Sequence, residues 1–134
     1  MNCQDIADRA ARKINNIWHG LYVHCPVCGD MWSLDPDAYG QPAECQNCHE
    51  EMEEYDLYAW LDDQLEISEF RHTDRHGPVS SAVILMGCGG PDVRLDTKTH
   101  QVIVTWGFDQ ATAEVDEGAC EELDRLAQDY WDAM

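Results

Sequence analysis

The sequence predicts an α+β fold in which a small, mostly antiparallel sheet is packed by an amphipathic C-terminal helix. The helix is predicted by apolar residues that recur with a period of 3.6 near the end of the chain. The sheet is predicted by apolar, partly β-branched runs separated by turn residues. With 134 residues, of which 44% are hydrophobic, the chain is long enough to fill the core of one ordinary domain.

The C-terminal helix has the clearest pattern. Its apolar stripe consists of Ala119, Leu123, Leu126, Ala127, Tyr130 and Trp131. Asp116 stands at the N-cap position, and acidic residues take the outer positions. We expect the large members of the stripe, including Tyr130 and Trp131, to be buried against the sheet, so that Trp131→Ala destabilises the fold strongly.

Two more helices are predicted. Residues 2–18 carry Ile6, Ala10, Ile14 and Ile17 at helical spacing, and Gly20 marks the end of this helix. Residues 54–64 carry Leu57 and Leu61 four positions apart.

Strands are expected at residues 65–72 and 79–88. The segment that begins at Leu65 is ambiguous, because Leu65 would also extend the preceding helix; the strand is favoured. Residues 93–96 and 101–106 flank a hairpin turn at residues 97–100.

Four of the seven cysteines form two closely spaced pairs. Cys25 and Cys28 are separated by two residues, sixteen residues follow, and Cys45 and Cys48 repeat the spacing. Each pair can turn onto one ion, and together they supply the four tetrahedral corners that Zn²⁺ prefers. We therefore expect one structural zinc ion. Iron in the same site and a redox role for the first pair are alternatives.

The residues around these cysteines predict a hairpin. Residues 21–24 form a strand that leads into the first pair, and residues 31–34 form the returning strand. His24 and His49 adjoin ligand cysteines and are expected near the metal or in solvent, not as ligands. The segment from about 21 to 53 resembles the zinc-ribbon family. Ribbons often bind nucleic acid through basic residues, but this segment has no Lys or Arg, so direct contact with phosphate is not expected.

Charge is the outlying property of the chain. The formal net charge is -19, and the 57 residues from 14 to 70 contain thirteen acidic residues and no Lys or Arg. Such a surface repels nucleic acid and attracts basic partners. Solubility or a salt-adapted host is the alternative explanation of the charge. The residues expected to contact a partner are Glu50, Glu51, Glu53, Glu54, Asp56, Asp62, Asp63 and Glu66. The like-charged pair Asp62 and Glu66 is expected to repel across one helical turn.

A second resemblance lies in the C-terminal half. Cys88-Gly89-Gly90-Pro91-Asp92-Val93, Asp96-Thr97 and Val104-Thr105-Trp106-Gly107 are similar to a segment of small uncharacterised proteins of phages and mobile elements, over about residues 60–131. In size and charge the chain also looks like phage inhibitors of CRISPR or restriction complexes. No activity transfers from the C-terminal resemblance; the likeness in size and charge implies an anti-CRISPR-like or anti-restriction-like DNA mimic that binds and inhibits a basic, nucleic-acid-binding host complex.

The alternative function is a zinc-ribbon adaptor or regulator that docks on another protein without copying DNA. Its contacts would be mainly hydrophobic and made through Trp32, Tyr39 or Trp60. Weak salt dependence and sensitivity to Trp32→Ala would distinguish it from mimicry.

An enzyme is not expected. Cys88 is the best candidate nucleophile, with His72, His76 or His100 as base, but no catalytic spacing links them. We expect Cys88 to be a buried residue at a strand end. Cys120 is expected in the core, and Cys3 on the surface.

The predicted organisation is a helix at 1–20, a zinc ribbon at 21–53 and an α+β domain at 54–134. No run of 18 apolar residues and no secretory signal is present, so a cytoplasmic protein without membrane contact is expected.

Overall fold

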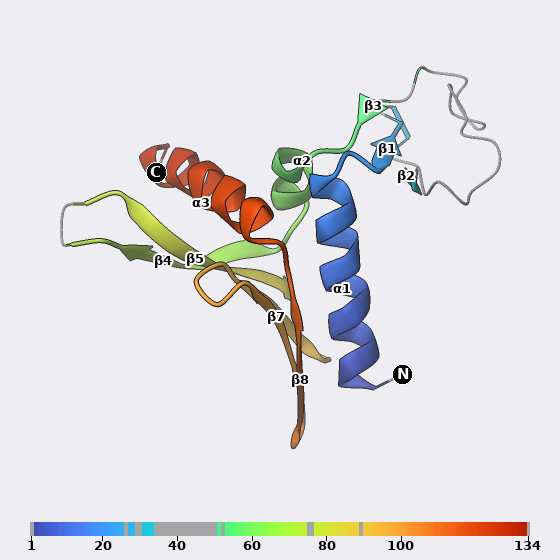
Figure 1. Cartoon of the computed structure of the whole chain (residues 1–134), viewed down its shortest axis with the longest axis vertical. Coiled ribbons are helices and arrows are strands. Elements are labelled where there is room, and N and C mark those ends of the chain that lie inside the picture. The colour runs from blue at the N-terminus through green and yellow to red at the C-terminus, as the bar shows by residue number, and fades with distance from the viewer. Residues whose placement is uncertain are drawn as a thin grey trace.

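The computed structural model of the chain describes residues 2–25, 27–28, 31–33, 51, 53–74, 77–88 and 90–133. In this part of the chain, two antiparallel sheets and three helices form an α+β structure, as the sequence predicts (Figure 1). None of the helices in these ranges has the length and apolar character needed to cross a membrane.

The larger sheet is a meander of consecutive strands. Its strands are β4 (Glu66–His72), β5 (Val79–Gly87), β6 (Asp92–Asp96), β7 (Gln101–Trp106) and β8 (Asp109–Glu114), and they are neighbours in that order. The strands predicted at residues 65–72, 79–88, 93–96 and 101–106 are confirmed to within one residue at either end. Thus Leu65 begins neither a further helical turn nor the strand itself.

Strand β8 was not predicted. Its sequence, Asp-Gln-Ala-Thr-Ala-Glu, has little of the β-branched and aromatic content that marks a strand. Only the alternation of Ala111 and Ala113 with polar neighbours signals it. The two alanines pack against the core, where their small size leaves room for a helix.

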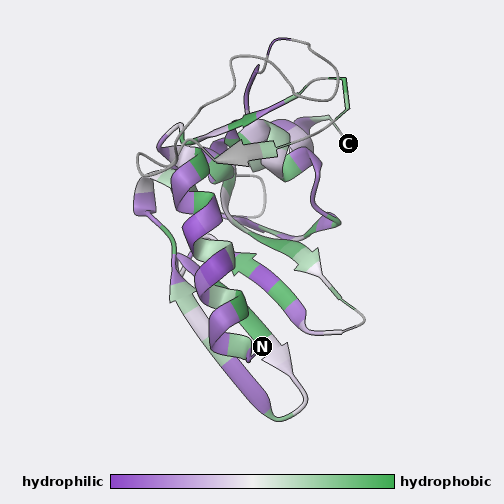
Figure 2. Cartoon of the chain, turned by 90° about the vertical axis from the view of Figure 1, so that its right-hand side faces the viewer, coloured by the Kyte–Doolittle hydropathy of each residue, from purple (hydrophilic) through white to green (hydrophobic). Residues whose placement is uncertain are grey.

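One face of the sheet holds the core. A row across the strands joins Ile67, Ile84, Leu95, Val102 and Ala113, which are register partners from β4 to β8. Helix α1 (Cys3–Trp18) packs on the β7–β8 half of this face and α3 (Glu117–Asp132) on the β5 half. Figure 2 shows α1 from its outer side, where hydrophilic residues predominate.

Polar contacts link the two helices at one end of the sheet. Asp116 occupies the predicted N-cap position of α3, but its side chain makes no capping hydrogen bond. Its Oδ2 instead lies 2.7 Å from His19 Nε2, and its backbone amide donates to Asn15 Oδ1 at 2.8 Å. The N-cap residue thus ties the start of α3 to the end of α1.

Three expectations about burial are wrong. Trp131 is 43% exposed and meets Phe70 and His72 at the sheet margin in tilted and edge-on contacts, with ring centroids 5.3 and 4.5 Å away. Cys3 is buried at 3% exposure, because the start of α1 faces β8. Cys88 is exposed, because it lies just beyond the end of β5. Cys120 is buried, as expected.

The smaller sheet lies at the C-terminal end of α1. It consists of β1 (Tyr22–His24), β2 (Met31–Ser33) and β3 (Glu53–Glu54), in the order β2-β1-β3. Strands β1 and β2 pair antiparallel, as the predicted hairpin requires. Helix α2 (Leu57–Asp62) follows β3 and buries Leu57, Trp60 and Leu61 in the main core.

Leu123→Ala is expected to lower the free energy of unfolding by about 2–5 kcal/mol, because the Leu123 side chain is fully buried and its removal leaves a cavity. Leu65→Ala is the matched control: Leu65 is 59% exposed, so the same truncation should change stability little. Urea unfolding of the two variants measures the difference, and equal losses would contradict this assignment of the core.

Asp124→Asn is expected to stabilise the fold at pH 7. Burial raises the pKa of Asp124, although the hydrogen bond from Thr97 Oγ1, 2.6 Å from Asp124 Oδ1, opposes the shift. A raised carboxyl pKa makes stability fall as pH rises through that pKa, so the ionised form is costly at pH 7. The advantage of Asn should shrink towards pH 4. Urea unfolding at both pH values tests this, and a loss of stability at pH 7 would contradict it.

Candidate metal centre and acidic face

The first cysteine pair lies at the end of β1. Cys25 follows this strand directly and is 1% exposed, whereas Cys28 is exposed. The backbone amide of Cys28 lies 3.5 Å from Cys25 Sγ and points towards it. Amide contacts of this kind stabilise a thiolate and orient it toward a metal. The described pair therefore fits one half of a four-thiolate zinc site.

The second half of the proposed zinc site lies outside the described residues. Cys45 and Cys48, its two predicted ligands, lie there, and so does His49, which is not an expected ligand. Among the described residues, no group of three or more His, Cys, Asp or Glu side chains is placed to hold a metal ion. Zinc therefore remains a prediction from the spacing of the cysteines, and the pairing of β1 with β2 agrees with it.

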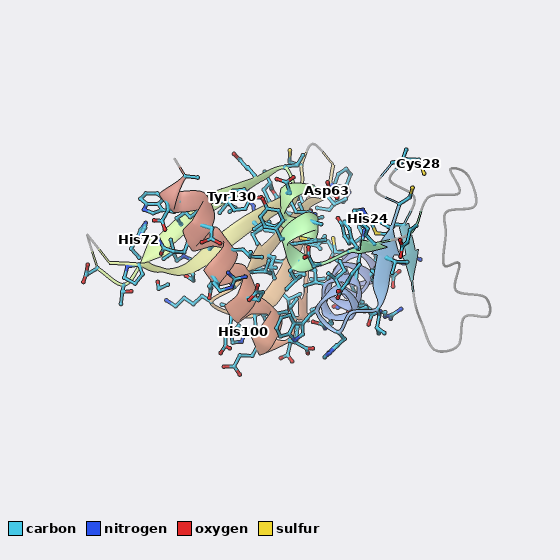
Figure 3. The ribbon with its side chains drawn as sticks, turned by 90° about the horizontal axis from the view of Figure 1, so that it is seen from above. His24, Cys28, Asp63, His72, His100 and Tyr130 are labelled. Atoms are coloured by element: carbon cyan, nitrogen blue, oxygen red, sulfur yellow. The ribbon has the colours of Figure 1, made fainter. Side chains whose placement is uncertain are left out.

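Helix α2 faces the first cysteine pair across an open hollow of about 520 Å³. Its walls include Cys25 and Cys28 on one side and Asp62 and Asp63 on the other. In Figure 3, Asp63 lies between Tyr130 of α3 and the end of the small sheet that carries His24 and Cys28. The fold thus brings two predicted metal ligands and two predicted partner-binding residues to one place.

Tyr55 joins the two sides of this hollow. Its ring is buried and meets the His24 ring edge to face, with centroids 5.1 Å apart. Its hydroxyl donates to Asp63 Oδ2 at 2.6 Å. Burial and this carboxylate raise the pKa of Tyr55 well above its ordinary value, so the hydroxyl remains a donor throughout the physiological range. The position of Asp63 is therefore tied to β1.

The carboxylates of α2 are held by neutral donors. Asp56 Oδ1 accepts from the Ala59 amide at 2.9 Å, and Asp62 Oδ1 accepts from the Tyr130 hydroxyl at 3.0 Å. Burial, together with Asp62, raises the pKa of Tyr130 to about 12. These hydrogen bonds fix the carboxylates without removing their negative charge.

We define the acidic face as the exposed carboxylates of this region that the structure describes. Its members are Glu51, Glu53, Glu54, Asp56, Asp62 and Asp63. Among the described residues, none of the six lies within 4.0 Å of a Lys, Arg or His nitrogen, so no ion pair neutralises them.

The ion pairs of the described residues lie elsewhere. Arg71 bridges to Asp96 at 2.9 Å on the sheet face opposite the helices. Burial alone would raise the pKa of Asp96, but hydrogen bonds from Arg71 and from backbone amides outweigh it and lower that pKa. Arg94 pairs with Asp92 at 2.7 Å, and Arg125 pairs with Glu122 on α3. These cations thus pair with carboxylates outside the acidic face, although Arg125 also lines a hollow with Glu54 and Asp56.

The structure places Glu66 on the large sheet, where it and Asp62 line the same hollow. Glu66 begins β4 and lies in the same cross-strand row as Arg94, whose pKa it helps to raise. The expected helical repulsion between Asp62 and Glu66 is wrong, because α2 ends at Asp62. Glu50 lies outside the described residues.

Sequence reasoning missed the two tyrosines that position this site. Tyr55 sits among acidic residues in the sequence, but its burial depends on β1, which lies about thirty residues earlier. Tyr130 was assigned to the core, yet its hydroxyl reaches across to α2. Trp60, a predicted contact residue of the adaptor alternative, is 2% exposed and unavailable to a partner; Tyr39 and the side chain of Trp32 lie outside the described residues.

In comparisons with known proteins, no family model matches the chain, and neither a curated protein nor a solved structure matches it.

Purified protein is expected to contain one zinc ion per chain, because four thiolates complete a tetrahedral site. Cys25→Ser and Cys45→Ser should each lower the zinc content, measured by inductively coupled plasma mass spectrometry. Cys88→Ser is the control, since Cys88 is exposed and belongs to neither pair. A native chain without zinc or iron, or full metal content in Cys25→Ser, would contradict the assignment.

Proposed function

We propose that the chain is an acidic, zinc-stapled binding protein whose acidic face occupies a basic, nucleic-acid-binding surface of a host complex and inhibits that complex. The observation that carries this proposal is the acidic face itself: six exposed carboxylates with no ion pair among the described residues. Negative charge that is not neutralised within the protein is available to a Lys/Arg-rich partner.

The way the carboxylates are held also supports binding. A flexible acidic side chain loses rotamer freedom when it binds, which costs about 0.5–1.5 kcal/mol for each immobilised side chain. Asp56, Asp62 and Asp63 are already fixed by hydrogen bonds from neutral groups. Such a surface presents charge at set positions, as a duplex backbone does, and complementary charge speeds encounter with the partner.

The proposed target class follows from charge and resemblance together. A net charge of -19 opposes direct binding to nucleic acid and favours proteins that bind nucleic acid. The expected resemblance of residues 60–131 to small phage and mobile-element proteins carries no activity, but it favours a mobile-element product that meets host defence proteins; small size and acidic charge favour an anti-CRISPR-like or anti-restriction-like inhibitor. Zinc at the four cysteines would order the segment that precedes the acidic face, so its role would be structural and not catalytic.

The adaptor alternative is supported by a different observation. Val27 is 66% exposed and Tyr58 is 56% exposed, and both line the hollow beside the first cysteine pair. A partner that binds mainly through these apolar side chains would bind with little dependence on salt.

Changing Glu51, Glu53 and Glu54 to Gln is expected to weaken binding to the host partner about tenfold at 0.1 M NaCl. Three exposed charge pairs of about 0.2–1 kcal/mol each account for a loss of this size. The partner would be identified as a host protein retained at 0.1 M and released at 0.5 M NaCl, then purified for titration calorimetry.

The matched control changes Glu114, Glu117 and Glu121 to Gln, which removes the same charge from exposed positions on β8 and α3. This control should lose much less affinity. Equal losses of affinity in the two triple variants would mean that net charge, and not the acidic face, determines binding. Unchanged affinity in both variants would favour the adaptor.

A further inference from the structure

The most exposed aromatic residue in the described chain lies at the β7–β8 turn. Phe108 is fully exposed, at 111% of its reference area, and its neighbour Trp106 is 55% exposed. We refer to Trp106 and Phe108 as the aromatic tip. The tip lies at the lower end of the molecule in Figure 1, opposite the small sheet and α2.

The backbone holds the aromatic tip in place. Trp106 pairs with Asp109 in the ladder, so Gly107 and Phe108 form a tight two-residue turn. Gly107 adopts φ +60°, which glycine tolerates and which such a turn requires. The Trp106 ring lies over Gly90, 3.5 Å from the position that a Cβ would take there. The tip is therefore presented by a ladder-paired hairpin.

A hollow of about 460 Å³ lies beside the aromatic tip. Its walls are Asn2, Cys3, Ile6, Pro91, Trp106 and Asp109. Ile6 and Pro91 make part of this surface apolar, and Asp109 gives it a carboxylate. Burial and the Asp109 carboxylate raise the pKa of the Cys3 thiol, so Cys3 contributes a neutral group to the wall.

We propose that the aromatic tip is a second docking element, which inserts into an apolar pocket bordered by Lys or Arg on the same basic partner that the acidic face binds. The inference rests on the proposed function for the identity of that partner. Phe108 buries no area within the chain, so its apolar surface does not stabilise the described fold. Exposed aromatic side chains of this kind are typical of protein interfaces.

Net charge favours a basic protein as the binding partner of the tip over a second copy of the chain or a membrane. A second copy of the chain would bring another net charge of -19 to the interface, and an anionic membrane would also repel the chain. A cationic pocket rim is attracted to Asp109 beside the tip.

The two docking elements lie at opposite ends of α1. The start of α1 meets the tip through Cys3, which shares a hollow with Trp106. The end of α1 meets the acidic region through Trp18, which shares another hollow with Glu54 and Asp56. Sixteen helical residues span about 24 Å at 1.5 Å per residue. The partner should therefore offer its apolar pocket at about that distance from its basic surface.

Photo-crosslinking of the full chain tests the proposal. p-Benzoylphenylalanine replaces Phe108 in one sample and Thr112, an exposed residue of β8, in the control. The purified partner should crosslink at position 108 and not at position 112. Phe108→Ala should weaken binding of this partner at least tenfold, by the same factor at 0.05 and 0.1 M NaCl, while Thr112→Ala leaves affinity unchanged. Both variants should melt like the native chain.

Several results would overturn the proposal. One is crosslinking at position 108 only to a second copy of the chain. Another is sedimentation with phosphatidylglycerol vesicles that the native chain shows and Phe108→Ala does not. The third is an affinity of Phe108→Ala for the partner equal to that of the native chain. The Glu51, Glu53 and Glu54 variant separates the two hypotheses. If this variant binds the partner normally while Phe108→Ala does not, the proposed function of the acidic face is wrong and the docking role of the aromatic tip stands. The reverse result rules out only the docking role of the tip.

Discussion

Burial of one face of the five-stranded sheet is the constraint on which the rest of the structure depends. Ile84, Leu95 and Val102 form the centre of that face, and each is at 0% exposure. Full burial of such a side chain stabilises the fold by about 1.5–3 kcal/mol, whereas a like-charged pair on a helix costs a few tenths of a kcal/mol. The core can therefore tolerate a strongly acidic exterior, and the helices must share one side of the sheet.

That packing also decides where the acidic residues point. Because α2 buries Leu57, Trp60 and Leu61, its carboxylates are left on the outside next to the first cysteine pair. The tyrosines that fix these carboxylates come from the segment after β3 and from α3. The geometry of the acidic face thus depends on contacts made across the fold, and its charge persists because none of its carboxylates forms an ion pair with a described Lys, Arg or His.

Much of the fold could be predicted from the sequence, because helical and strand periodicities are local properties. All three helices and four of the five large-sheet strands lie where the pattern of apolar residues places them. Strand β8 was missed because Ala111 and Ala113 pack against α1, so residues too small to signal a strand are the ones that fit there. The burial of Cys3 and the exposure of Cys88 and Trp131 depend on which edge each helix covers, and no local pattern reports this.

The candidate site was predictable in part. The cysteine spacing and the run without cations could be read directly, whereas the hydrogen bonds of Tyr55 and Tyr130 required the tertiary structure. That Glu66 lies on a strand, and not one helical turn beyond Asp62, likewise depends on where α2 ends.

Competition with nucleic acid tests the central claim most directly. The purified partner would be saturated with a labelled DNA duplex and titrated with the native chain, with fluorescence anisotropy of the DNA as the readout. Mimicry of the phosphate backbone predicts mutually exclusive binding, so the anisotropy should fall to that of free DNA. A ternary complex that holds DNA and the chain together at saturation would contradict the account.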